Sequence, residues 1–259
     1  MPEIIREEIY DGIAVYEYEE FDLKEPSFFV LGLPDAGLVG GISVSHLIRV
    51  LNPREIGGID ILRMTPPIVI IKKGDPRPPL RLFAKDNVLI LAAESPIPPS
   101  VIYQLSHGIL EYSVKRRIDY MVSLTGLGTP NRVEISKPKV YWAASGKKAL
   151  EEVARLGVDR LDDGILIGPY AVILKDATRY RLNSIVLLVE CFPDLPDPEA
   201  AAEILKVFSK LTGTSIDVSK LLEEAEIIRM RTKELMKHTA KVMNQMGKSM
   251  EMRPSLLYT

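Results

Sequence analysis

The sequence SFFVLGLPDAGLVGG at residues 27–41 combines a short apolar run with a glycine-rich turn. Residues 27–33, bounded by Pro26 and Pro34, predict a buried strand. The next apolar segment, residues 42–51, predicts a helix that ends before Pro53, because a residue that precedes proline is biased away from helical geometry. A buried strand followed by a turn and a helix is the repeating unit of layered α/β proteins.

The rest of the chain repeats this alternation. Because strands and helices interleave, we predict one layered α/β domain over residues 1–215, with a mixed, largely parallel sheet flanked by helices. Strands are expected at residues 9–21, 55–63, 68–72, 80–84, 88–92, 119–124, 140–144, 164–174 and 183–190, and helices at residues 100–115, 146–156 and 199–211.

Composition excludes several classes of partner. The 259 residues carry 33 basic and 35 acidic side chains, and a net charge of −2 provides no footprint for nucleic acid or an anionic membrane. No apolar run approaches the ~20 residues of a membrane span. The single cysteine, Cys191, excludes an internal disulfide. These features predict a cytoplasmic protein with no membrane or nucleic-acid partner, and loops rich in proline favour a thermophilic source.

Residues 216–246 predict a long interaction helix capped by Asp217. Its apolar positions recur at alternating steps of three and four, which is typical of a helix seam. The seam would either lie across the protein's own core or pack against sister subunits in a homo-oligomer above dimer, such as a tetramer or pentamer. The predicted oligomer interface consists of Leu221, Ala225, Ile228, Leu235 and Val242.

Residues 247–259 predict a flexible tail with little periodicity and a proline at position 254. The tail ends in Leu257, Tyr258 and Thr259. An apolar residue, a tyrosine and a terminal carboxylate form a docking motif, because the carboxylate can pair with a lysine while the ring supplies buried area.

Catalytic signals are weak. The glycines of residues 37–41 follow a strand and precede a helix, a setting suited to phosphate, yet the segment matches neither GxGxxG nor GxxxxGK[ST]. Close helix–strand packing is therefore the favoured interpretation, and a phosphate- or nucleoside-binding enzyme stays as the alternative. Four acids near predicted strand ends could meet in a crevice, although such acids more often cap helices or face solvent: Glu94, Asp119, Asp163 and Glu190.

Metal and nucleophile motifs are also missing from the sequence. His46, His107 and His238 have no HxH or HExxH spacing, and no GxSxG elbow occurs. Cys191 has no histidine in its local motif, which favours a buried, inert thiol. We therefore predict no catalytic residue, no metal and no cofactor.

Several segments resemble archaeal homologues of proteasome-assembly chaperones. They are residues 28–40, MVSLTGLG at 121–128, GILIGPYAVIL at 164–174 and the ending Leu257-Tyr258-Thr259, which is similar to the hydrophobic-Tyr-X motif of proteasome activators. The resemblance implies a nucleoside-phosphorylase-like fold without catalytic residues, homo-oligomers, and binding to the α-subunit ring of the core proteasome through Leu257, Tyr258 and Thr259. It predicts a non-enzymatic proteasome-assembly chaperone or activator. A scaffold whose tail is sequestered, and whose partner is another homologue, is the other alternative.

Overall fold

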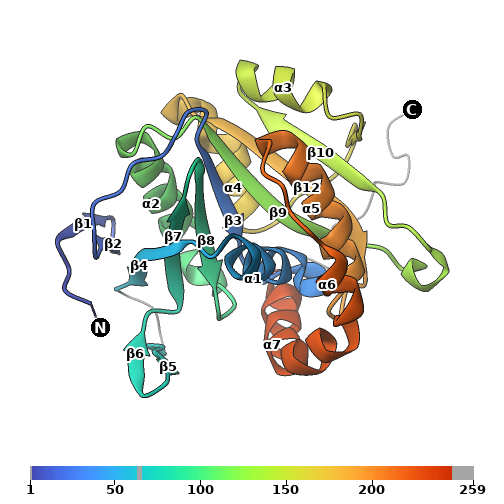
Figure 1. The fold of residues 1–259 in the computed structure, drawn as a ribbon, viewed down its shortest axis with the longest axis horizontal. Coiled ribbons are helices and arrows are strands. Elements are labelled where there is room, and N and C mark those ends of the chain that lie inside the picture. The colour runs from blue at the N-terminus through green and yellow to red at the C-terminus, as the bar shows by residue number, and fades with distance from the viewer. Residues whose placement is uncertain (1, 63–65, 247–259) are drawn as a thin grey trace.

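The computed structural model describes residues 2–62 and 66–246, which form one large sheet covered by helices on both faces (Figure 1). The sheet has ten strands in the order β1-β2-β4-β7-β8-β3-β9-β12-β10-β11, and β5 and β6 form a separate hairpin. The strands are β1 (Arg6–Tyr10), β2 (Ile13–Glu17), β3 (Phe28–Gly32), β4 (Arg54–Ile61), β5 (Ile70–Lys72), β6 (Asp75–Arg77), β7 (Leu80–Lys85), β8 (Val88–Ala93), β9 (Tyr120–Gly128), β10 (Val140–Ser145), β11 (Asp159–Arg160) and β12 (Asn183–Cys191). The α-helices are α1 (Val39–Leu51), α2 (Ile102–Lys115), α3 (Lys147–Ala154), α4 (Pro169–Asp176), α5 (Pro198–Thr212), α6 (Ser219–Glu223) and α7 (Ala225–Gln245).

The predicted mixed sheet flanked by helices is confirmed, but antiparallel pairings outnumber parallel ones. Within the described strands of the large sheet, five pairings are antiparallel and four are parallel. The parallel strands β8, β3, β9 and β12 lie together at the centre. Strands joined by tight turns must run antiparallel. Asp86 and Asn87 join β7 to β8, and Asp11 and Gly12 join β1 to β2 with positive φ angles of 45° and 83°.

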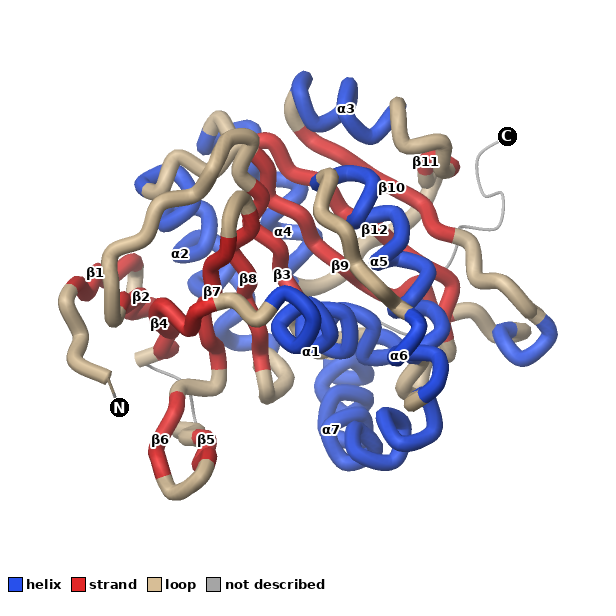
Figure 2. The backbone as a smooth tube through the Cα atoms, in the orientation of Figure 1, coloured by secondary structure: helices blue, strands red, loops and turns tan. Residues whose placement is uncertain are grey.

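Alternation along the central strands divides the core into two layers. Phe28 and Val30 point to one face of the sheet, whereas Phe29 and Leu31 point to the other. The first face is covered by α1, α3, α5 and α7, and the second by α2 and α4 (Figure 2). The strand predicted at residues 27–33 is therefore buried on both faces, as parallel central strands are.

The strand predicted at residues 164–174 is wrong. This segment enters α4 at Pro169, after Gly168 with a φ of 97°. Proline is well suited to the first helical position, because its φ is already helical and its missing N–H would be unsatisfied there anyway. The apolar run that follows is short enough to fit a strand or a buried helix, so periodicity alone could not separate the two.

The predicted long helix is present as two helices. Residue Glu224, with φ −97° and ψ 10°, separates α6 from α7. The Asp217 carboxylate accepts a hydrogen bond from the Ser219 N–H at 2.9 Å, as expected near a helix start. Met236 and Met243 of α7 are buried in the core layer that contains α1 and α5. The helix therefore lies across the protein's own core, which was one of the two interpretations of its seam.

Candidate functional site

The central parallel strands β8, β3, β9 and β12 end side by side, and ligands of open α/β sheets bind at this carboxyl edge. The turn from β3 to α1 lies here. Asp35 is 3% exposed, and its carboxylate accepts hydrogen bonds from the Ala36 N–H and the Thr125 hydroxyl, both at 2.5 Å. The one acid in this turn is thus used to fasten the turn to β9.

Three glycines of the turn, Gly32, Gly37 and Gly40, are in close contact with neighbouring residues. A Cβ added to Gly40 would lie 2.5 Å from the Leu124 carbonyl oxygen, and one added to Gly32 would lie 2.3 Å from a methyl group of Val44. Gly37 has a φ of 60° and faces Cys191. These contacts leave no room for side chains at Gly32 and Gly40, so these glycines serve the close helix–strand packing that the sequence favours.

Helix α7 fills the space above this turn. Thr239, Val242, Met243 and Met246 face Leu33, Pro34 and Tyr170, and the cavity between them is only about 10 Å³. That volume holds about one water molecule, whereas ligand pockets are typically some 300–1,000 Å³. This part of the carboxyl edge is therefore closed to a nucleoside.

Tyr170 is fully buried beneath α7. Its hydroxyl accepts from the Leu33 N–H at 2.7 Å and donates to the Leu31 carbonyl at 3.2 Å. Burial raises the pKa of Tyr170 well above its usual range. The phenol therefore stays neutral and ties α4 to the end of β3.

A groove of about 370 Å³ lies between α1 and α7, with apolar walls and a polar rim. On the rim, Arg49 pairs with Glu224 at 2.6 Å. His46 Nε2 lies 2.7 Å from the Asp217 carbonyl oxygen, and its Nδ1 lies 3.1 Å from Arg49. Burial lowers the pKa of His46. A neutral ring that donates from Nε2 and accepts at Nδ1 satisfies both contacts.

The strand-terminal acids singled out in the sequence do not converge. Glu94 pairs with Lys72 at 2.5 Å and contacts Arg81. Asp119 lies at the opposite end of the sheet, before β9, and accepts from Ser27. Glu190 accepts the Lys139 backbone N–H, and Asp163 is exposed. Each of the first three therefore has a structural partner, as strand-end acids commonly do.

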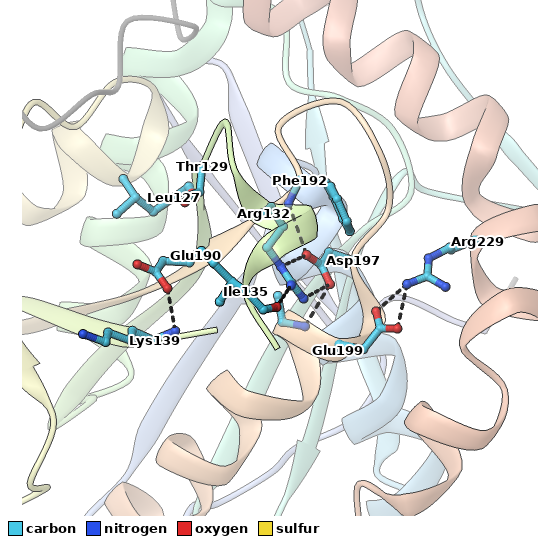
Figure 3. A network of polar contacts seen from close by, with 11 residues as sticks. Leu127, Thr129, Arg132, Ile135, Lys139, Glu190, Phe192, Asp197, Glu199 and Arg229 are labelled. Atoms are coloured by element: carbon cyan, nitrogen blue, oxygen red, sulfur yellow. Dashed lines mark hydrogen bonds and ion pairs between the residues drawn. The ribbon is translucent and has the colours of Figure 1, made fainter. Parts of the chain in front are cut away.

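A buried ion pair between Arg132 and Asp197 was missed by sequence reasoning (Figure 3). The two side chains are 7% and 0% exposed, and the Arg132 Nε lies 2.7 Å from the Asp197 carboxylate. Asp197 also accepts from the Phe192 and Ala200 N–H groups, so it caps α5. Asp197 followed by Pro198 is the sequence signal of a helix start that would have located the acid, although not its arginine partner.

The predicted interface residues divide into two groups. Leu221 and Ala225 are buried within the chain, at 1% and 8% exposure. Ile228, Leu235 and Val242 are only half-buried. Neighbouring positions on the outer side are more open, including Met230, which is 65% exposed. A contact between subunits on these helices would therefore use the second group and its exposed neighbours.

The docking motif Leu257, Tyr258 and Thr259 lies outside the described residues. Within residues 2–62 and 66–246, no group of three or more His, Cys, Asp or Glu side chains is placed to hold a metal ion. No helix in these ranges combines the length and apolar character needed to cross a membrane. Cys191 is buried beside Gly37 and Gly126.

Comparisons with known proteins agree with this architecture. The family model for the PAC2 family matches residues 29–236. PbaA of Pyrococcus furiosus, described as an archaeal homolog of proteasome-assembly chaperone, is 33% identical, with a TM-score of 0.78 over 85% of this chain and 96% of that one. PbaB of the same organism, described as an archaeal proteasome activator, shares the fold at 21% identity and a TM-score of 0.72, over 86% of this chain and 98% of that one.

A sequence relative covers nearly the whole chain as well. The uncharacterized protein MJ0106 of Methanocaldococcus jannaschii is 27% identical over 242 residues, which are 93% of this chain and 98% of that protein. The family model spans the central strands, the turn at residues 32–41 and most of α7. The chain therefore belongs to the PAC2 family.

Proposed function

We propose that this protein is a non-enzymatic chaperone or activator of the proteasome that binds the α-subunit ring of the core particle through Leu257, Tyr258 and Thr259. The observation that carries the proposal is the likeness to PbaA, at 33% identity over 85% of the chain. The shared fold of PbaB, an archaeal proteasome activator, is consistent with it. Such a protein would work in the cytoplasm, where its partner is found.

The tail motif would bind as an extended plug. Eleven residues separate Met246 from Tyr258, and an extended chain of that length spans at most ~40 Å. The Leu257 side chain and the Tyr258 ring would enter an apolar pocket, and the terminal carboxylate would pair with a lysine of the ring. Each tail would contribute on the order of 2–4 kcal/mol, the scale of an interface hot spot.

The filled carboxyl edge supports a role without catalysis. Helix α7 occupies the space that a substrate of an α/β enzyme would use, and the acids nearby are held by structural partners. The alternative of a phosphate- or nucleoside-binding enzyme would have to use the groove of about 370 Å³ beside Gly41, where His46 and Arg49 are already held by Asp217 and Glu224.

Several tails on one particle would bind together. We propose a homo-oligomer above dimer, a tetramer or pentamer, whose subunits meet through the outer faces of α6 and α7. Linked weak plugs gain affinity through effective concentration. Changing Ile227 and Met230, both exposed, to glutamate should reduce the particle size in light scattering, while Lys147→Glu on α3, away from these helices, should not. A monomeric wild type would contradict this proposal.

Surface plasmon resonance on immobilised archaeal core proteasome tests the docking motif. Deleting residues 257–259, or changing Tyr258→Ala, should reduce binding at least 10-fold, because every tail of the particle loses the same contact. Ser255→Ala lies in the tail but outside the motif and should bind like the wild type. Light scattering on each variant verifies that the assembly is intact. Equal binding by wild type and deletion would refute docking through the tail and favour a scaffold whose tail is sequestered and whose partner is another homologue.

A further inference from the structure

Helices α6 and α7 project from the body of the protein beside α1 (Figure 1). Their outer side exposes three large apolar residues, Leu222, Ile227 and Met230, which are 46%, 43% and 65% exposed. Single apolar residues on a surface are normal, but these three follow closely on one another in the chain. We call Ile227 and Met230, which share α7, the outer strip.

The groove of about 370 Å³ between α1 and α7 lies on another side of α7. Its apolar walls come from Leu38 and Ile42 on one side and from Leu221, Ile228 and Leu235 on the other. Ile228 and Leu235 are only half-buried, so the described part of the chain does not close this surface by itself. An apolar groove between two helices is a shape that receives the apolar side of another helix.

The outer strip and the groove face different directions. Successive residues of an α-helix turn by about 100°, so Ile227 and Met230 point about 120° away from Ile228 and Leu235. One copy can therefore offer its outer strip to one neighbour and its groove to another. Contact between two unlike patches is heterologous, and it closes into a ring when the rotation between neighbours fits.

Shape and charge both favour contact between these unlike patches. A two-fold contact would place one outer strip on the other and leave both grooves empty. The ion pairs found among the described residues include none for Glu223, four residues before Ile227, and none for Arg231 on the groove rim. Contact between strip and groove would bring this acid and this base toward each other, whereas contact between two strips would bring together two copies of Glu223.

We propose that the groove is filled by the outer strip of a second copy, so that Ile227 and Met230 of each subunit pack against Ile42 and Leu235 of the next around a ring. The inference rests on the homo-oligomer proposed above and specifies its contact. A ring with a single rotation axis directs every C-terminal tail to the same end of the particle, which linked docking on one proteasome ring requires. A tetramer built from two-fold contacts would divide its tails between two ends.

Disulfide cross-linking of the full-length protein tests this contact. The double variant Ser45→Cys with Met230→Cys carries one thiol in the groove and one on the outer strip. Because these positions face different sides of the same chain, a disulfide between them has to join two copies. Mild oxidation should therefore convert most of the protein into a ladder of covalent dimers, trimers and larger species on a denaturing gel.

Three controls accompany the double variant. Each single variant should run as a monomer on the gel, because its only other thiol, Cys191, is buried. Met230→Cys with Leu150→Cys pairs the outer strip with an exposed position of α3, outside the groove, and should form no ladder.

Filling the groove gives a second test that leaves the outer strip unchanged. Ser45 is exposed and lines the groove, so Ser45→Trp places a large side chain where the neighbouring subunit would insert. Light scattering over a dilution series should show association weakened about 10-fold. Val50→Trp, further along α1 and outside the groove, should associate like the wild type.

Four results would overturn the proposed contact. Covalent dimers from Met230→Cys alone would show that two outer strips meet across a two-fold axis. A double variant that stays unlinked, while light scattering shows an intact oligomer, would place the contact elsewhere and leave the proposed oligomer standing. A disulfide between Ser45→Cys and Ser255→Cys would assign the groove to the tail of the chain. A monomeric wild type would overturn the oligomer and this contact together.

Discussion

Helices α1 and α7 pack on the same face of the sheet, yet they are held to it very differently. Seven of the 13 residues of α1 are buried, whereas α7 has four buried among its 21. α1 begins at a turn where Gly32 and Gly40 leave no room for a side chain, and α7 lies on the core through a narrow stripe around Met236 and Met243. Because stability follows buried contacts, α1 belongs to the most stable part of the protein and α7 to a part that can open locally.

The polar contacts of the two regions differ in the same way. Around the sheet, the Arg132–Asp197 pair is almost fully buried, at 7% and 0% exposure. Arg229 joins α7 to Glu199 of α5 at 2.6 Å, but these side chains are 31% and 36% exposed. Breaking a buried pair leaves an uncompensated charge, whereas solvent screens a partly exposed one. The subunit contact proposed above would use helices that can adjust while the sheet stays intact.

Removing the buried arginine should give the largest effect. Arg132→Ala leaves the Asp197 carboxylate buried without its cationic partner, and we expect the free energy of unfolding to fall by about 3–5 kcal/mol. Arg229→Ala, the matched change on α7, should cost under about 1 kcal/mol, because Glu199 remains accessible to water. Urea denaturation followed by the fluorescence of the single tryptophan, Trp142, measures both. Similar losses from the two variants would show that α7 is anchored as firmly as the sheet.

Two adjacent glycines at the start of α1, Gly40 and Gly41, allow a sharper comparison. Gly40→Ala places a Cβ 2.5 Å from the Leu124 carbonyl oxygen, so the backbone must move, and we expect the free energy of unfolding to fall by about 1–3 kcal/mol. Gly41 is the next residue of the same helix, and nothing lies within 4 Å of a Cβ added there. Gly41→Ala should therefore stabilise the protein by up to about 1 kcal/mol through helix propensity. Thermal unfolding of both variants decides whether packing or propensity controls this helix.

Sequence reasoning located the parts of the fold that depend on local pattern. The buried strand at residues 28–32 and helix α1 were predicted because apolar runs bounded by prolines and glycines signal their own ends. Helix α4 was not predicted, because its short apolar run fits the repeat of a helix as well as that of a strand. The excess of antiparallel pairing was not predicted either, because it depends on turns such as Asp86-Asn87.

The candidate site was less accessible to sequence reasoning, because its main features join residues far apart in the chain. The closure of the carboxyl edge brings Leu33 and Pro169 against Met243, and no local pattern encodes that contact. The same holds for the partner of Asp197, which lies 65 residues away at Arg132. The tail motif, by contrast, is visible in the sequence alone, and its role remains a prediction.

The smallest predicted effect is a loss of stability at acidic pH. It should again distinguish the C-terminal helices from the central sheet. Burial lowers the pKa of His46, which connects α1 to the start of α6 through the Asp217 carbonyl. Because the unfolded chain, with a histidine pKa near 6.5, binds the proton more readily than the folded one, stability should rise with pH through the window below about 6.5 and fall on acidification. Protonation would also place a second N–H against the Arg49 guanidinium, while Glu224 and Asp217 partly offset the added charge.

Hydrogen exchange at pH 5 and pH 7 tests whether that loss is local. After correction for the intrinsic effect of pH on exchange, amides of α6 and the first turns of α7 should be less protected at pH 5 than at pH 7 in the wild type, because the protonated His46 ring faces the Arg49 guanidinium, while amides of β3 and β9 should keep their protection. His46→Gln can still donate to the Asp217 carbonyl but does not titrate, so it should lose most of the difference. His238→Gln, on the exposed side of α7, is the matched control and should behave like the wild type. Equal acid sensitivity in α6 and in the central strands would mean that the two regions open as one unit, and the contrast between α1 and α7 would then lie in exposure alone and not in stability.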